Sequence, residues 1–250
     1  MRKQKERNSI VIIVAYVVLG IISFMCIAPV VLMAVASFTD NDVLNLYGYT
    51  YFPQKWSLEA YEFLIKQGTV ISKSFLNSIL VTFMGTALGI MVTVLLAYTI
   101  SRKELVGRKL IMLFVFFTML FNGGMVPTYL MYTQIFHIKN TMWALLFPHL
   151  LVNGFNVLLV RTFFNENIPE VLLEAARIDG AGEISIFRNV VLPISKPILA
   201  TIGLLVGVGY WNDWYNGLLF VTDVNYYTLQ NFLNKIIIAF VQLVHQHHFF

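Results

Sequence analysis

Residues 169–182 read Pro169-Glu170-Val171-Leu172-Leu173-Glu174-Ala175-Ala176-Arg177-Ile178-Asp179-Gly180-Ala181-Gly182, the most polar segment in the second half of the chain. Apolar runs flank it at 142–160 and 198–220. Asn167 can cap a helix here, Pro169 is tolerated in a first turn, and Gly180 and Gly182 are stop signals. An apolar stripe lies between these signals: Val171, Leu172, Ala175, Ala176 and Ile178. The sequence predicts a short amphipathic helix on a membrane surface, which is most simply a docking element.

The composition is that of a membrane protein. Of 250 residues, 58% are hydrophobic and only 12% are charged, whereas about one-quarter of a soluble domain is charged. The apolar runs are long and show no alternation of period two, so the fold class is all-α and polytopic rather than a β-barrel. The single cysteine, Cys26, excludes a disulfide framework and a cysteine metal cluster.

We expect five membrane spans, near residues 10–36, 75–100, 110–132, 141–164 and 198–220. They form one transmembrane domain, 10–221, which follows a short N-terminal segment, 1–9, and contains the polar loop 165–197. Ala34-Val35-Ala36 resembles a signal-peptide cleavage site, but the apolar run before it is about twice as long as a signal core. The glycines at 123 and 124 and Pro127 predict a broken or kinked third span.

The basic residues set the expected orientation. With the N-terminus inside, segments 1–9, 101–109 and 161–196 are cytoplasmic and hold 12 of the 17 Lys and Arg residues. This asymmetry agrees with the positive-inside rule. It also accounts for the net charge of +4 without nucleic-acid binding, because the charges are scattered at segment ends. The chain is therefore expected in the plasma membrane, with a cytoplasmic N-terminus and the polar loop facing the cytoplasm.

The segment 222–250 is expected to be an external tail. Its first part, to Lys235, is polar, and only nine largely apolar residues follow at 236–244. The residues after Lys235 are too few to cross the hydrocarbon core again. His245, His247 and His248 could bind a metal, but no carboxylate lies nearby, so a solvated chain end is the simpler interpretation.

A second polar segment lies at membrane depth in the fifth predicted span: Trp211, Asn212, Asp213, Trp214, Tyr215 and Asn216. Aromatic ring faces beside amide and carboxylate groups are what a sugar requires for binding. An interfacial aromatic belt with an interhelical hydrogen bond explains the same residues equally well. The weaker candidates for a pore lining are Asn122, Asn153 and Asn156.

No enzymatic site is visible. The sequence contains no Gly-x-x-x-x-Gly-Lys-[Ser/Thr] phosphate loop, no Gly-x-Ser-x-Gly and no His-Glu-x-x-His. We therefore expect a transport subunit without a cofactor or metal of its own, which cannot hydrolyse ATP by itself.

The polar loop resembles the EAA signature of ABC importer membrane subunits. Glu174-Ala175-Ala176, Gly180 and Leu192-Pro193 occur at the signature spacing, and Val190 stands where isoleucine is usual. The resemblance implies that this loop is the coupling helix, which sits in a cleft of the ATPase subunit. Glu174 would make the polar contact, and Ala175, Ala176, Asp179, Gly180, Leu192 and Pro193 would complete the coupling site. The alternative is a surface helix that only connects two spans.

Further residues resemble the carbohydrate-uptake branch of these binding-protein-dependent permeases. They are 179–181, Phe187 and Pro197, and the segments 122–129 and 211–220 are similar to the complex-polysaccharide or oligosaccharide subgroup. The resemblance covers about residues 10–237. It implies an ATP-driven sugar importer that pairs with a second permease chain, two ATPase subunits that bind ATP, and an extracellular sugar-binding lipoprotein.

Several alternatives remain open at this point. The chain could serve an ABC importer of peptides, amino acids or ions, or it could be a secondary transporter without an ATPase. The resembled family has a sixth span where this chain has its tail, so we expect a truncation or an altered reading frame near Ile238. A non-functional remnant or a purely structural subunit is therefore a further alternative.

Overall fold

The computed structural model describes residues 2–148 and 151–247, with side chains from 11 to 148, from 151 to 239 and at 242. The described residues form helices and one isolated β-bridge, between Thr39 and Trp56. They divide into two compact units, 1–69 and 70–250, which are described separately. The predicted histidine cluster lies outside the described side chains.

The first unit consists of three helices, α1 (Arg2–Ser37), α2 (Asn41–Tyr47) and α3 (Glu59–Lys66). The described side chains of α1 are largely exposed although most are apolar. A loop joins α2 to α3. Asp40 accepts a hydrogen bond from the backbone N–H of Asp42 at the start of α2, and its carboxylate lies 2.6 Å from the Lys55 ammonium. This ion pair, with the bridge at Thr39 and Trp56, closes the loop.

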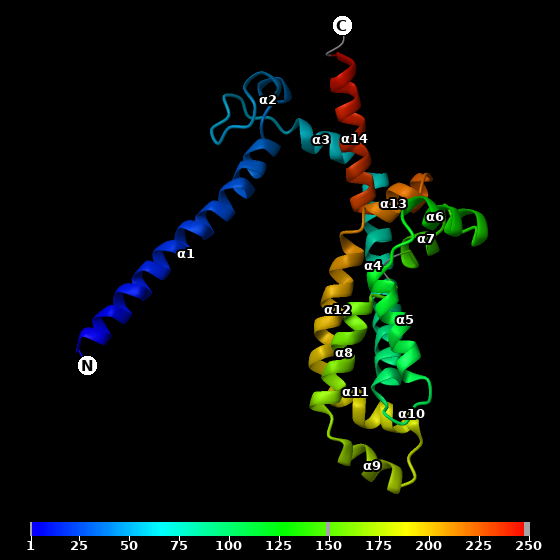
Figure 1. The fold of residues 1–250 in the computed structure, drawn as a ribbon. Helices are drawn as coiled ribbons and strands as arrows, with labels where there is room; N and C mark the ends of the chain where they lie inside the picture. Colours follow the sequence, from blue (N-terminus) through cyan, green and yellow to red (C-terminus); the bar gives the residue numbers. More distant parts are fainter. Residues whose placement is uncertain (1, 149–150, 248–250) are drawn as a thin grey trace. The chain divides into compact units, whose positions relative to one another are not determined.

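The second unit is a helical bundle with short helices at both ends (Figure 1). The long helices are α4 (Gly68–Ser101), α5 (Arg108–Leu120), α8 (Gly154–Asn167), α12 (Lys196–Trp211) and α14 (Leu229–His247). At one end lie α9 (Glu170–Ile178), α10 (Glu183–Ile186) and α11 (Leu192–Ile194), with the π-helical segment Phe187–Val191 between the last two. At the other end lie α6 (Met125–Leu130), the π-helical segment Met131–Ile135, α7 (Trp143–Leu146), α13 (Tyr215–Phe220) and a 3-10 turn, Val224–Tyr226.

Apolar side chains of α4, α8 and α12 form the core of this unit, and Ala97, Val157, Val160 and Ile202 are completely buried. Glycines allow the helices to approach closely. A Cβ at Gly85 of α4 would overlap the Tyr210 ring of α12, and a Cβ at Gly89 would lie 3.0 Å from Val206. These two glycines therefore allow α4 and α12 to pack closely.

Helix length and composition identify candidate membrane spans. Val11–Ser37 and Gly68–Ser101 qualify as single helices. Two bent pairs qualify if each counts as one span: Arg108–Leu120 with Met125–Ile135, bent by 114°, and Glu183–Ile194 with Lys196–Trp211, bent by 81°. The described residues thus give two to four candidate spans, against the five that the sequence predicts. The predicted break of the third span is confirmed, since α5 ends at Leu120 and α6 begins at Met125.

Two other predicted spans are not continuous helices. In the fourth, 141–164, α7 ends at Leu146 and α8 begins only at Gly154. In the fifth, 198–220, α12 ends at Trp211 and α13 begins at Tyr215. The physical reason is that side chains on either side of the second break donate hydrogen bonds to backbone carbonyls of the first break.

The segment before Lys235 is helical from Leu229 onward. A single 19-residue helix, α14, begins at Leu229, within the segment that the sequence predicts to be polar and external. Asn231 is completely buried, and a Cβ at Gly217 of α13 would lie 2.7 Å from its Cβ and Cγ atoms. The polar side chain therefore faces a neighbouring helix rather than forming part of a solvated loop.

Candidate functional site

The predicted docking helix is present as α9 and has two distinct faces. Val171, Glu174, Ala175 and Ile178 are all exposed, and they recur at the spacing of one helix face. The exposed fractions are 72% for Val171 and 86% for Ile178. On the inner face Leu173 is buried and Ala176 packs against the core. The apolar stripe is thus divided, and Glu174 lies among apolar side chains on the free face.

The C-terminal end of α9 is fixed by backbone hydrogen bonds. Gly180 has a left-handed backbone, with φ of +82°, and its N–H donates to the Arg177 carbonyl at 3.0 Å. The N–H of Ala181 donates to the Ala176 carbonyl at 2.9 Å. This pair of bonds is the Schellman motif, which satisfies carbonyls at a helix end and favours glycine. Gly180 therefore ends the helix as predicted, and Asp179 is its exposed C-cap residue.

The N-terminal end differs from the prediction. Asn167 is the last residue of α8, where its side-chain amide donates to the Phe163 carbonyl at 3.1 Å, so it does not cap α9. Pro169 occupies the N-cap position of α9 in extended conformation, without a side-chain hydrogen bond. Glu170 lies in the first turn, where a carboxylate favours the helix dipole.

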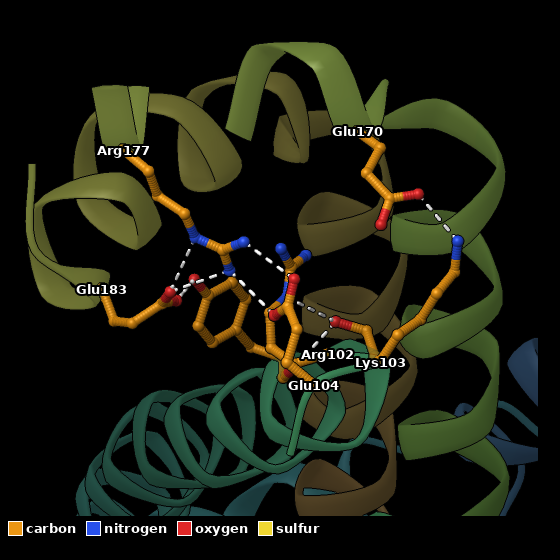
Figure 2. Close-up of polar contacts among 8 residues, drawn as sticks. Arg102, Lys103, Glu104, Glu170, Arg177 and Glu183 are labelled. Carbon is orange, nitrogen blue, oxygen red and sulfur yellow. Dashed lines mark hydrogen bonds and ion pairs between the residues drawn. The ribbon is translucent and has the colours of Figure 1, made fainter. Parts of the chain in front are cut away.

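Arg177 attaches the inner side of α9 to two neighbouring segments (Figure 2). Its Nη1 and Nη2 donate to the two carboxylate oxygens of Glu104, in the loop between α4 and α5, at 2.8 and 2.9 Å. Nη2 also donates to Glu183 at the start of α10, at 2.9 Å. The other Glu183 oxygen accepts a hydrogen bond from the Tyr98 hydroxyl of α4 at 2.6 Å. The guanidinium therefore joins α9, α10, the α4–α5 loop and, through Glu183, the end of α4.

A second ion pair holds the other end of the helix. The Lys103 ammonium lies 2.7 Å from the Glu170 carboxylate (Figure 2). The Arg177 hydrogen bonds lower the pKa of Glu104 below its ordinary value, with burial acting weakly in the opposite direction. The Glu104 and Glu183 carboxylates likewise raise the pKa of Arg177. The α4–α5 loop thus holds α9 near both of its ends, and the face with Glu174 remains free.

The last two residues of the predicted coupling site lie at a corner of the fold. Leu192 and Pro193 belong to α11, just before the bend into α12. Leu192 lines an apolar hollow together with residues of α4, such as Ile90 and Val94, while Pro193 is exposed. Leu192 therefore packs between helices, in contrast to the free face of α9.

At the opposite end, two polar side chains bind open backbone groups: Asn216 of the second predicted site, and Tyr210, which lies just before that site. The Tyr210 hydroxyl donates to the Leu146 carbonyl at 2.8 Å, and the Asn216 amide donates to the Pro148 carbonyl at 2.9 Å. These carbonyls lie at and just beyond the end of α7, where the helix is interrupted. Asn216 is only 2% exposed. Both residues therefore stabilise the broken helix, as the alternative of an interhelical hydrogen bond predicts.

The other candidates for the substrate path have mixed environments. Asp213 accepts a hydrogen bond from the N–H of Asn216, and the Trp211 ring contacts Phe75 edge-on at 6.0 Å. Asn212 is exposed, although its amide donates to the Val208 carbonyl, and Trp214 is 45% exposed. The weaker candidates also serve the backbone: Asn122 accepts from Gly124 N–H in its own turn, Asn153 caps α8, and Asn156 is buried. Asn212 and Trp214 therefore offer the most accessible surface.

Sequence reasoning missed the residues that hold α9 in place. They are Tyr98, Lys103, Glu104, Glu170, Arg177 and Glu183. The available signal was topological, because the predicted orientation places segments 101–109 and 161–196 on the same side of the membrane with both signs of charge. Tyr210 was missed as well, and its spacing gives no signal, since its partner is a backbone carbonyl 64 residues earlier.

Comparisons with known proteins agree with this geometry. The sequence model of the family described as "Binding-protein-dependent transport system inner membrane component" matches residues 85–241. The polygalacturonan/rhamnogalacturonan transport system permease protein YtcP of Bacillus subtilis is 36% identical over 93% of this chain and 80% of that protein. Protein LplC of the same bacterium is 36% identical over 88% of this chain and 73% of its own length.

A solved structure shows the same fold. It is the crystal structure of a bacterial ABC transporter involved in the import of the acidic polysaccharide alginate. One of its chains matches 91% of this chain and 80% of its own length, with a TM-score of 0.81 and 28% sequence identity. The trehalose/maltose transport system permease protein MalG of Thermococcus litoralis is a more distant relative, 30% identical over 88% of this chain.

Proposed function

Because the chain belongs to the family of binding-protein-dependent transport system inner membrane components, we propose that it forms part of the membrane path of an ATP-driven importer of an oligosaccharide. It is an ABC transporter permease with a polytopic helical fold. The sugar class is supported by the relatives, whose names refer to polygalacturonan, rhamnogalacturonan, trehalose and maltose, and by the alginate importer. The specific sugar for this chain is not implied by these names.

We propose further that α9 docks on an ATPase subunit. The observation that carries this proposal is the free face of α9, where Glu174 lies between Val171, Ala175 and Ile178 on a helix that is held at both ends. Glu174 would make a charged contact, and the small Ala175 would allow close packing. Gly180 and Asp179 would set the end of the docking helix. Leu192 and Pro193 would transmit its movement into α12.

The proposed partners follow from the family and from the charge pattern. They are a second permease chain, two ATPase subunits that bind ATP, and an extracellular sugar-binding lipoprotein. The basic N-terminal segment and the loops at 101–109 and 161–196 favour a cytoplasmic N-terminus in a bacterial plasma membrane. In that orientation α9 faces the compartment that contains ATP. Closure of the ATPase dimer would then move α9 and rock the spans between two states.

For the substrate path we propose a reduced set of contacts. Trp214 and Asn212 have the most accessible surface, so an aromatic ring face and an amide are available to a sugar. Trp211 and Asp213 would position them, since the Asp213 carboxylate accepts a hydrogen bond from the Asn216 N–H in the first turn of α13. Asn216 would support the path through the Pro148 carbonyl, and Asn122 would act at the bend between α5 and α6.

The test is a charge reversal on the free face of α9. We would express the chain with its partner permease and ATPase, and compare wild type with Glu174→Lys. Uptake of the oligosaccharide and substrate-stimulated ATP hydrolysis are expected to fall by at least about tenfold, because an interfacial charge pair becomes a repulsion. The subunit itself should still reach the membrane, because Glu174 is exposed.

Glu59→Lys is the matched control. Glu59 is also exposed and also lies on a short helix, α3, but in the other compact unit. Unchanged transport in this variant shows that charge reversal alone has no effect. Wild-type uptake by Glu174→Lys would refute the docking role, and co-purification without any ATPase would refute the importer itself.

A further inference from the structure

A polar cavity lies beneath α9, on the side opposite to its free face. Its volume is about 620 Å³, and four structural elements contribute to its walls. These are the end of α4 with the loop after it, the start of α5, the second half of α8 and the inner face of α9 from Glu170 to Arg177. Neither the proposed docking face nor the proposed substrate path includes this cavity.

The charges around the cavity are unbalanced. Five basic side chains line it, Arg102, Lys103, Arg108, Arg161 and Arg177, against three acidic ones, Glu104, Glu166 and Glu170. Two of the acidic groups are already engaged, Glu104 by Arg177 and Glu170 by Lys103. Three arginines remain, Arg102, Arg108 and Arg161, against the single carboxylate of Glu166, which leaves an excess of two positive charges.

Among the described residues these arginines have no carboxylate within ion-pair distance. Within the described part of the chain, the Arg108 side chain has no hydrogen-bond partner, and the Arg161 side chain donates one long bond, 3.4 Å from Nε to the Ile100 carbonyl. The Arg102 guanidinium lies 4.6 Å above the centre of the Tyr98 ring. In Figure 2 it lies between the Arg177–Glu104 pair and the Lys103–Glu170 pair. Guanidinium groups without carboxylates favour an anion whose oxygens match their fork of donors, above all a phosphate.

The position of the cavity indicates where that phosphate comes from. α4, a candidate span, ends at Ser101, and α5, half of a bent candidate span, begins at Arg108. The cavity therefore lies where apolar helices end, at the level of the lipid headgroups. From Arg108 onward α5 presents exposed apolar side chains, namely Leu110, Leu113, Phe114 and Phe117. A lipid whose headgroup occupies the cavity can place its acyl chains along this surface.

We propose that the cavity binds the phosphate of an anionic phospholipid from the adjacent leaflet, with Arg108 and Arg161 as its main ligands and Arg102 as a third. Basic pockets at the ends of membrane helices provide this type of headgroup site. The bound phosphate lies under α9 and supplies the negative charge that the surrounding arginines lack. The site is independent of the identity of the transported sugar.

The test measures lipid retention by the full chain, purified with the subunits that co-purify with it. The complex is equilibrated with equal amounts of phosphatidylglycerol and phosphatidylcholine, and retained lipid is counted by native mass spectrometry. Wild type is expected to prefer phosphatidylglycerol. The double variant Arg108→Gln/Arg161→Gln is expected to lose this preference by roughly 30-fold, because each interfacial charge contributes a factor of roughly five.

The matched control is Arg188→Gln/Lys196→Gln, which removes two exposed basic groups outside the cavity. It should retain phosphatidylglycerol like wild type. The single variant Arg108→Gln is a second test if the double variant is unstable, since no hydrogen bond or ion pair of the Arg108 side chain to another described residue is lost in it. Equal retention by the cavity variants and wild type would overturn the proposal. Displacement of the lipid by millimolar inorganic phosphate would also overturn it, by showing that the cavity prefers a soluble anion.

Discussion

The two ends of the helical bundle use polar side chains in opposite ways. At the α9 end, charged side chains from different segments pair with each other, as Arg177 does with Glu104 and Glu183. At the α13 end, neutral polar side chains pair with backbone carbonyls, as Tyr210 does with Leu146. The first arrangement is half exposed to solvent, and the second is buried among helices.

This difference indicates how much movement and substitution each end of the bundle can tolerate. Exposed ion pairs contribute little to global stability, so the α9 end can move or repack at low cost in free energy. A buried carbonyl without a donor costs much more, so the α13 end must keep its contacts. We expect substitutions at the α13 end to destabilise the whole unit, and substitutions at the α9 end to act locally. The following predictions test this contrast, from the largest effect to the smallest.

The largest effect is expected from Gly85→Val. A Cβ at this position would overlap the Tyr210 ring, and α4 and α12 pack too closely for the ring to be accommodated elsewhere without a shift. Overpacking of this kind should lower the free energy of unfolding by about 3 kcal/mol, measured by denaturant titration in detergent micelles.

Gly20→Val in α1 is the control, since nothing lies within 4 Å of a Cβ placed there. It should leave the free energy of unfolding of the second unit unchanged. An equal effect of the two substitutions would mean that helix propensity, rather than the contact with Tyr210, determines the result.

Tyr210→Phe should have the next largest effect. It removes the hydroxyl that donates to the Leu146 carbonyl and leaves that buried acceptor without its donor. The expected loss is about 2 kcal/mol in the free energy of unfolding, with faster hydrogen exchange in α7. Tyr47→Phe, on the exposed surface of α2, is the control. A loss at Tyr210 no greater than at Tyr47 would contradict the structural role of this bond.

The contrast between the ends also explains what the sequence could predict. The helix 170–178, its glycine stop and the break near Pro127 depend on local signals, and all three are present in the structure. The breaks within the predicted spans 141–164 and 198–220 depend on bonds between residues more than 60 positions apart, which no local pattern reveals. The burial of Asn231 could not be predicted for a related reason, because only the fold shows which helix packs against it.

The candidate sites follow the same division. The position of Glu174 on a free face could be predicted from helix periodicity and from the resemblance of its loop to the EAA signature. The role of Asn216 could not be predicted in the same way, since an aromatic and amide segment fits a sugar site and a structural hydrogen bond equally well. The coordinates distinguish them at this residue only because they show which carbonyl the amide binds.

At the α9 end, Gly180→Ala should have a local effect. Gly180 has a φ of +82°, which an L-residue with a Cβ adopts at a cost of about 1 kcal/mol, although nothing lies within 4 Å of the added atom. Hydrogen exchange in α9 should accelerate accordingly, while the unfolding midpoint of the bundle changes little. Gly182→Ala is the control, because its φ is −73° and its Cβ site is equally open. Identical exchange in both variants would exclude backbone strain as the cause.

Arg177→Met should loosen α9 by a smaller amount. The substitution keeps a long apolar stem but removes the bonds to Glu104 and Glu183, each worth about 0.5 kcal/mol at this partly exposed site. A double-mutant cycle with Glu104→Gln isolates one of the two pairs. Coupling between Arg177 and Glu104 should be measurable in hydrogen exchange of α9. A coupling of zero would mean that the pair is held in place by its surroundings without stabilising them.

The smallest effect should be a pH dependence of the contact between Arg177 and Glu104, which holds α9 in place. The Arg177 hydrogen bonds hold the pKa of Glu104 below its ordinary value of 4.5, so the carboxylate is bound more strongly when it is charged. Its contribution is therefore fully present above the ordinary pKa and is lost as the pH falls through the lowered value. Hydrogen exchange in α9, corrected for intrinsic rates, should accelerate below about pH 4.5. Glu104→Gln should reduce this acceleration, leaving the part that Glu183 contributes. An unchanged pH profile in Glu104→Gln would place the titrating group elsewhere at the α9 end, and would leave the Arg177–Glu183 bond as the contact that holds the helix.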